Sequence, residues 1–304
     1  MWLFLAFTGP VLWAVSTHID KYLVDRFFKN SDTAVLMVFT ALLGLLMLPF
    51  IAVLESGIFA SSLRDIAIMA VSGILYMGAM LFYLRAIQQE EASVIAPLFQ
   101  LSTLFTFALA YIFLGEALSW KEGGGAALIV GGVLSLSVDR SFRLRKFSGK
   151  LVLTMAVATF VLALSSVAFK FFAVRDRFWV TTFWITVGEG LFGLAILAIP
   201  HYRRQFLALF AKNPGAMLAI NGANELINLA GSLTVRAASL LAPVALVSAV
   251  SSTTTLLVFL IGIGLTLVAP KFGHEDLSTR ALTQKGIGAA LVALGVALLG
   301  GPGH

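Results

Sequence analysis

The polar side chains best suited to do chemistry lie in the apolar segment 215–236. Asn221, Asn224 or Glu225, and Asn228 recur there at helical spacing, which puts amides and a carboxylate on one face of a helix. Polar groups that face lipid are costly, so this face is expected to look into the protein or a water-filled cavity. We predict that Asn221, Asn224, Glu225 and Asn228 bind a small-molecule substrate. The alternative is that they only hydrogen-bond neighbouring helices.

Two tyrosines lie on the segment 66–88, which pairs with 215–236 in the internal repeat described below. Tyr76 and Tyr83 each offer an apolar ring and a hydroxyl, a combination that suits the wall of a partly hydrated cavity. Both are candidate substrate contacts. Tyr83 could instead anchor its helix at the membrane surface, where aromatic residues are enriched.

Prolines open two further apolar segments, and polar side chains follow each of them. Gln100 follows Pro97, and Ser251 follows Pro243. A proline in a helix leaves a carbonyl without its partner and bends the helix, which membrane bundles tolerate beside cavities. Gln100 and Ser251 are therefore candidate substrate contacts, as is His18 in the first apolar segment. Serine hydroxyls can also bond back to a carbonyl of their own helix.

Charged side chains inside the apolar segments are candidates for coupling. Lys21 and Lys170 occupy matching positions in the two halves; if both point inward, they would attract an anionic group such as the carboxylate of an amino acid. The alternative is that they are ordinary lysines at helix ends. Glu189 and Glu225 are the acids deep inside the segments. Each could carry a proton for coupled transport, or pair with a base such as Lys21, Lys170, Arg85 or Arg236.

The composition identifies the class of protein that holds these residues. Of 304 residues, 59% are hydrophobic and 12% are charged, whereas a soluble domain has about 25% charged residues. The chain is therefore a polytopic membrane protein. The four histidines are far apart and cysteine is absent, so no metal site, cofactor or disulfide is predicted. No nucleophile clusters with a base, so we predict no catalytic residue and no enzyme. The net charge of +6 resides in short loops, which is no sign of a nucleic-acid partner.

We predict an all-α membrane protein with ten transmembrane helices, since each span needs about 20 apolar residues. The expected spans are 2–22, 33–54, 66–88, 92–114, 120–138, 150–171, 179–200, 215–236, 239–264 and 281–301.

The two halves of the chain repeat each other. The stretch 14–26 aligns with 163–175, and Ala96-Pro97 aligns with Ala242-Pro243. We predict a first five-helix repeat over 1–140, a basic linker over 141–149 and a second repeat over 150–304. Five is an odd number, so the second repeat must enter the membrane from the opposite side, which gives two inverted repeats around a central cavity.

These features resemble a known family. The ten spans, the repeat and the stretch LGEALSWKEGGGAALIVGGVLSL (114–136) are similar to the drug/metabolite transporter superfamily, in its EamA-type ten-helix branch. The best motif is the Gly115-Glu116 turn before a glycine-rich helix. The second half departs from it, because Gly262 stands where Glu116 would be. The resemblance implies a ten-helix bundle with a central cavity and export of small metabolites, amino acids or drugs.

Two criteria give opposite predictions for the side of the membrane on which the termini lie. Fifteen of the 21 lysines and arginines belong to the loops after the odd-numbered spans and to the adjoining helix ends. The positive-inside rule puts these loops in the cytoplasm and both termini outside. The family resemblance suggests cytoplasmic termini instead.

The sequence thus predicts a secondary transporter that exports small metabolites by alternating access, as a monomer or homodimer in the bacterial inner membrane. Its expected partners are a small-molecule substrate and membrane lipid, with proton coupling as an option. A flippase for lipids or lipid-linked sugars is the alternative within transport. An intramembrane enzyme or a non-transporting scaffold is the alternative from other classes.

Overall fold

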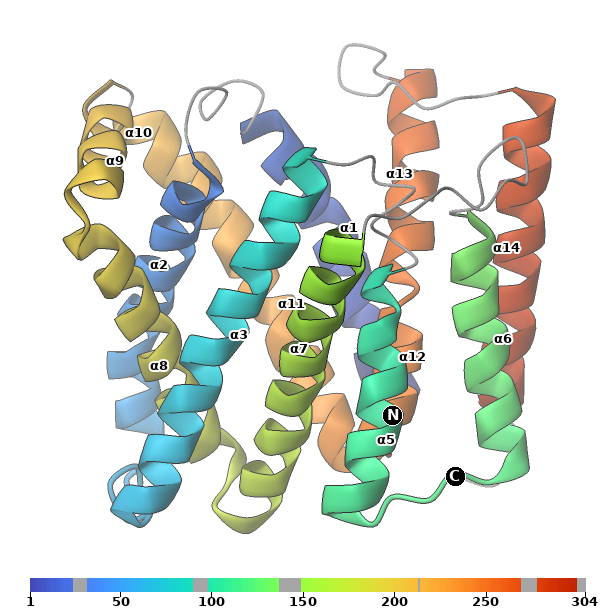
Figure 1. Cartoon of the computed structure of the whole chain (residues 1–304), viewed down its shortest axis with the longest axis horizontal. Helices are drawn as coiled ribbons and strands as arrows, with labels where there is room; N and C mark the ends of the chain where they lie inside the picture. Colours follow the sequence, from blue (N-terminus) through green and yellow to red (C-terminus); the bar gives the residue numbers. More distant parts are fainter. Residues whose placement is uncertain (24–31, 90–97, 137–148, 213, 269–277, 300–304) are drawn as a thin grey trace.

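The computed structural model of the chain is a bundle of helices (Figure 1), and it describes residues 1–23, 32–89, 98–136, 149–212, 214–268 and 278–299. The first half contains α1 (Trp2–Leu23), α2 (Thr33–Leu54), α3 (Leu63–Gln89), α5 (Leu101–Leu114) and α6 (Trp120–Leu136). The second half contains α7 (Gly149–Arg175), α8 (Phe178–Ala198), α9 (Pro200–Lys212), α10 (Pro214–Ala216), a π-helical segment (Met217–Asn221), α11 (Gly222–Leu241), α12 (Val244–Ser251), α13 (Thr254–Val268) and α14 (Thr279–Leu299).

Each of the ten predicted spans coincides with helical structure. Not every one of these helices is long and apolar enough to cross a membrane by itself. Among the described residues, seven helical segments meet that requirement, with α12 and α13 taken together as Val244–Val268. The fourth predicted span is described from residue 98 onward, and α5 is a shorter apolar helix. α6 has 17 residues, and α11 carries the polar stripe. The predicted linker 141–149 lies outside the described residues except for Gly149.

Two predicted boundaries in the second half are wrong. The eighth span was expected to stop at residue 236, but α11 continues to Leu241, and α12 begins at Val244 instead of the expected 239. The helix passes Arg236 because this side chain turns into the bundle instead of marking the membrane edge. It ends before Pro243, which has no N–H to continue the ladder and sits at φ −52°, ψ 129°.

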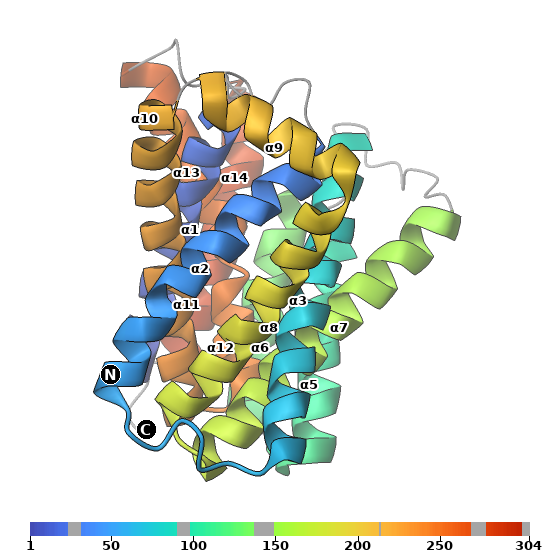
Figure 2. The same cartoon turned by 90° about the vertical axis from the view of Figure 1, so that its left-hand side faces the viewer.

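Helices distant in sequence pack side by side in the bundle. α1 packs against α11, α3 packs against α7 and α8, and α2 packs against α8. α6 and α14 form an antiparallel pair at one edge of the bundle (Figure 1). α9 crosses α2 at one end of the bundle (Figure 2), where its Phe206 ring lies 4.5 Å from that of Phe39. The interior cavity lies among α1, α3, α7, α8, α11 and α12.

Glycines mark where helix backbones approach most closely. A methyl group on Gly73 of α3 would overlap the carbonyl oxygen of Ile185 on α8, and one on Gly188 of α8 would overlap that of Ala70 on α3. Between α6 and α14, a methyl group added to Gly125 or to Gly295 would meet the other helix. Small residues let helices approach in lipid, where dispersion contacts and not water drive association.

We therefore expect Gly73→Ala to destabilise the protein by about 1–3 kcal/mol, because the new methyl must push α3 and α8 apart. Gly78→Ala is the matched control on the same helix, since its methyl would meet the Phe192 ring at an ordinary 3.8 Å. The measurement is thermal unfolding of both purified variants in detergent. Equal stability of the two variants would contradict the close α3–α8 contact.

Candidate functional site

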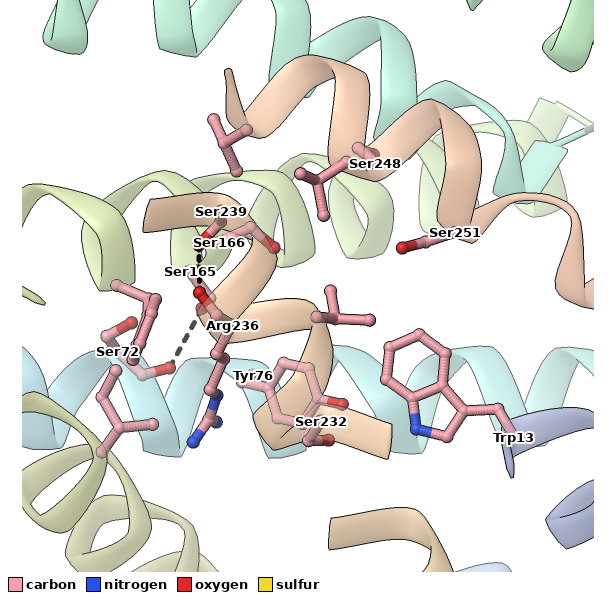
Figure 3. A pocket seen from close by; sticks show the side chains of 15 residues that line it. Trp13, Ser72, Tyr76, Ser165, Ser166, Ser232, Arg236, Ser239, Ser248 and Ser251 are labelled. Atoms are coloured by element: carbon pink, nitrogen blue, oxygen red, sulfur yellow. Dashed lines mark hydrogen bonds between the residues drawn. The ribbon is translucent and has the colours of Figure 1, made fainter. Parts of the chain in front are cut away.

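A cavity of about 170 Å³ lies in the interior of the bundle. Figure 3 shows that its walls come from both halves of the chain, with Trp13 from α1, Ser72 and Tyr76 from α3, and Arg236 from α11. Seven serines share the lining, namely Ser72, Ser165, Ser166, Ser232, Ser239, Ser248 and Ser251. Apolar side chains of α7, α8, α11 and α12 complete the walls. The cavity therefore combines hydroxyl groups with aromatic and aliphatic surface.

The serine hydroxyls differ in whether they already donate a hydrogen bond within the protein. Ser165 Oγ donates to the Ser72 carbonyl at 3.1 Å, and Ser239 Oγ donates to the Arg236 carbonyl at 2.6 Å (Figure 3). Ser166 Oγ bonds back to the Leu162 carbonyl of its own helix. By contrast, the buried Ser72 Oγ and Ser251 Oγ have no hydrogen-bond partner within the described structure. A buried hydroxyl without a partner is costly, so these two are free to bind a ligand.

Arg236 brings a positive charge to the cavity wall. Its Nη2 donates to Glu189 Oε1 at 3.2 Å, and its guanidinium carbon lies over the ring of Phe169, 5.3 Å from the ring centroid. The two side chains of this ion pair are 18% and 19% exposed. Arginine has five N–H donors, so a single contact with Glu189 leaves donors for a second carboxylate. The wall can thus bind an anionic group beside the serine hydroxyls.

The predicted polar stripe of α11 is buried, but it does not line this cavity. Asn224 Nδ2 donates to Asp20 Oδ1 of α1 at 2.7 Å, and Thr40 Oγ1 of α2 donates to Glu225 Oε1 at 2.6 Å. The Asn228 carbonyl accepts from Trp13 Nε1 at 3.3 Å. α1 and α2 therefore cover the stripe, and the cavity begins about one turn further along α11, at Ser232.

Asn221 has a different environment from the rest of the stripe. It is 1% exposed, ends the π-helical segment, and borders an apolar groove between α2, α9 and α11. Neither of its amide atoms has a hydrogen-bond partner within the described part of the chain.

The remaining predicted contacts divide between the cavity and other places. Tyr76 and Ser251 line the cavity. Tyr83 packs on the ring of Phe99 at 4.4 Å, and His18 Nε2 lies 3.1 Å from the Val258 carbonyl oxygen. Gln100 is buried in a turn that precedes α5. These three residues lie outside the cavity lining.

The predicted charged residues also separate. Lys21 is exposed, so the inward orientation considered for it is not observed. Lys170 pairs with Glu116 and donates to the Ala242 carbonyl at 2.6 Å, which joins α7 to the turns before α6 and α12. Glu189 pairs with Arg236, one of the bases considered for it.

Sequence reasoning missed Trp13 and Asp20, and it considered Arg236 only as a possible partner of Glu189 or Glu225 and not as part of a cavity wall. Residue 236 is the end of the expected span 215–236, although Arg236 lies eleven residues after Glu225 and four after Ser232, on the same helical face. That spacing is the signal that could have found it. Among the described residues, no group of three or more His, Cys, Asp or Glu side chains could hold a metal ion.

Comparisons with known proteins show which fold the chain shares. No curated protein matches it. Twenty-one chains of solved structures match its fold. One is a crystal structure of a protein with 15% sequence identity, and the match covers 98% of this chain and 96% of that chain with a TM-score of 0.68. This similarity establishes a shared fold over nearly the whole length.

A family model matches the first part of the chain. It describes the EamA-like transporter family and matches residues 1–138, which include α1 to α6 and the Gly115-Glu116 turn. The chain is therefore a multi-pass membrane protein whose residues 1–138 match the EamA-like transporter family.

Proposed function

We propose that the two halves of the chain, 1–140 and 150–304, form inverted five-helix repeats. The helix pairs that pack together support this, because exchanging the halves maps one pair onto another. The α1–α11 pair corresponds to α7–α3, and the α5–α7 pair corresponds to the contacts of α12 and α13 with α1. The pairs α2–α8 and α6–α14 each join a helix to its own counterpart. Such exchange is expected of a twofold axis in the membrane plane.

The protein works as a secondary transporter by alternating access in the bacterial inner membrane and exports its substrate. The cavity receives Trp13, Ser72 and Tyr76 from the first half, and Ser165, Arg236 and other residues from the second. Because the two halves both contribute walls, rocking of one half against the other would open the same cavity first to one side and then to the other.

The substrate is an amino acid or a related small metabolite with a carboxylate. The observation that carries this proposal is the free donor capacity of Arg236 beside the unpartnered hydroxyls of Ser72 and Ser251. A volume of about 170 Å³ suits a molecule of that size better than a large drug. Aliphatic and aromatic walls leave room for an uncharged side chain.

The test is uptake of radiolabelled neutral amino acids, one at a time, into proteoliposomes that contain the purified protein. We expect saturable uptake of at least one of them. Ser251→Ala should raise its KM about fivefold, the value of one lost hydrogen bond. Ser252→Ala is the matched control, because Ser252 Oγ already bonds the Ala249 carbonyl and lies outside the cavity lining. No uptake of any amino acid, or equal effects of the two substitutions, would contradict the proposal.

A second candidate function, movement of a lipid, is favoured by one observation. The groove bordered by Asn221 has a volume of about 370 Å³ and is otherwise lined by apolar residues of α2, α9 and the π-helical segment, with Gly222 at the start of α11. Such a surface could hold an acyl chain. The same proteoliposomes, prepared with a fluorescent phospholipid, discriminate the two functions: protein-dependent transfer of the lipid between leaflets would favour the flippase.

A further inference from the structure

Asp20 of α1 and Glu225 of α11 are two acids that lie near each other in the bundle. Asp20 and Glu225 lie within electrostatic range of each other, and Glu225 is 9% exposed. Among the described residues, no lysine, arginine or histidine forms an ion pair with either of them. Two like charges in a medium of low dielectric constant repel each other strongly. Glu225 is buried and Asp20 is half-buried, so a cation that neutralises them would stabilise this part of the bundle.

The hydrogen bonds around the two acids leave one acceptor unused. Asn224 is fully buried and donates Nδ2 to Asp20 Oδ1 at 2.7 Å, while its own Oδ1 has no partner in the described structure. Thr40 Oγ1 donates to Glu225 at 2.6 Å. The cluster thus gathers carboxylate, amide and hydroxyl oxygens, and its orphaned amide oxygen lies on the residue that contacts Asp20. Oxygen atoms of these kinds are the ligands of hard cations and the acceptors of a proton.

Among the residues that the structure describes, the charged groups on the surrounding helices form no ion pair with the cluster. On α1, His18 contacts the Val258 carbonyl, and Lys21 is exposed. On α8, Glu189 adds a further negative charge within range of Glu225. Arg236 on α11 is engaged by Glu189. α2 contributes the Thr40 hydroxyl and no charge to the cluster.

We propose that Asp20, Asn224 and Glu225 form the binding site of a single monovalent cation, either a proton or Na⁺, that drives transport. This inference rests on the proposed transport function and names its energy source. The cluster adjoins the cavity: the Asn228 side chain bonds Glu225, and the Asn228 carbonyl accepts from Trp13, which lines the cavity wall. With the cation bound, α1 stays packed against α11. Without it, repulsion between the two acids favours separation of these helices, and Trp13 moves with α1.

The first test needs no substrate. Thermal unfolding of the purified protein is measured from pH 5.5 to 8.5, in NaCl or in choline chloride of equal ionic strength. A proton site predicts that the midpoint rises by at least about 2 °C on acidification in both salts. A sodium site predicts the same rise with NaCl at alkaline pH. The double variant Asp20→Asn/Glu225→Gln should lose this dependence, because amides need no cation.

The control is Asp65→Asn, which changes an acid near the start of α3 that accepts from Ser62 far from the cluster; it should keep the dependence on the cation. A wild-type midpoint that responds to neither cation, or a double variant that responds as the wild type does, would overturn the proposal.

A second measurement separates this proposal from the proposed function. In proteoliposomes, Asp20→Asn/Glu225→Gln should keep exchange of an amino acid across the membrane without a gradient, within about threefold of the wild type. Accumulation driven by an imposed pH or Na⁺ gradient should fall at least about tenfold. If the wild type transports no amino acid but its unfolding still depends on the cation, the proposed substrate is wrong and the cation site stands. Undiminished accumulation by the double variant removes the cation site and leaves the transport function.

Discussion

Arg236→Met should strongly weaken transport of a carboxylate-bearing substrate and also destabilise the protein. The substitution removes the positive charge from the cavity wall and leaves Glu189 without its partner, which had been 3.2 Å away. Loss of a charged partner from a buried pair costs about 2 kcal/mol or more in binding, so the substrate KM should rise at least about thirtyfold. Uptake kinetics in proteoliposomes measure this change.

The loss of stability should be about 3 kcal/mol, at the low end for a broken buried pair, because both side chains keep some exposure. Arg236→Met/Glu189→Gln removes the stranded charge, so its unfolding midpoint should return most of the way to wild type while transport stays weak. Arg64→Met, at an exposed position near the start of α3, is the control and should change neither property. Normal transport by the double variant would show that Arg236 serves only to neutralise Glu189.

Glu116→Ala should destabilise the protein by about 3 kcal/mol without a direct effect on substrate affinity. Glu116 pairs with Lys170, and its Oε2 accepts from the Val244 N–H at 2.8 Å, where α12 begins. The substitution leaves the Lys170 ammonium, in a side chain that is 12% exposed, with the Ala242 carbonyl as its remaining partner. It also leaves the first N–H of α12 without an acceptor. Thermal unfolding measures the stability.

Two further variants separate the effect of the unpaired Lys170 charge on stability from the effect of the hydrogen bond lost by Val244. Glu116→Gln keeps an acceptor for Val244, and Glu116→Gln/Lys170→Met also removes the unpaired ammonium, so stability should rise from Ala to Gln to the double variant. Neither residue lines the cavity, so the substrate KM of the double variant should stay within about twofold of wild type. A large rise in KM at restored stability would instead make Lys170 a substrate contact.

Much of the architecture could be predicted from the sequence because it follows from periodicity and hydrophobicity. Apolar runs of sufficient length defined ten helical spans, and each coincides with helical structure. The sequence does not determine where a helix ends when a charged residue can either mark the end of a span or lie inside the bundle. Arg236 is the clearest case: sequence reasoning ended the helix there, whereas pairing with Glu189 lets it continue to Leu241.

The site itself could be predicted only in part. Helical spacing alone placed Asn224 and Glu225 on one face of α11, and that face is indeed buried. Spacing along one helix cannot tell which neighbour covers each turn, so it could not separate the part of α11 that contacts Asp20 and Thr40 from the part that opens on the cavity. That separation depends on where α1 and α2 lie against α11.

The sequence by itself determined that this is a membrane bundle with polar groups turned inward, because lipid penalises exposed polar side chains regardless of their partners. Only the tertiary structure decided which charged and polar side chains contact one another. Glu189 with Arg236, Glu116 with Lys170, and Asp20 with Asn224 join residues 47, 54 and 204 positions apart, and these pairs depend on helix packing, which no local pattern encodes.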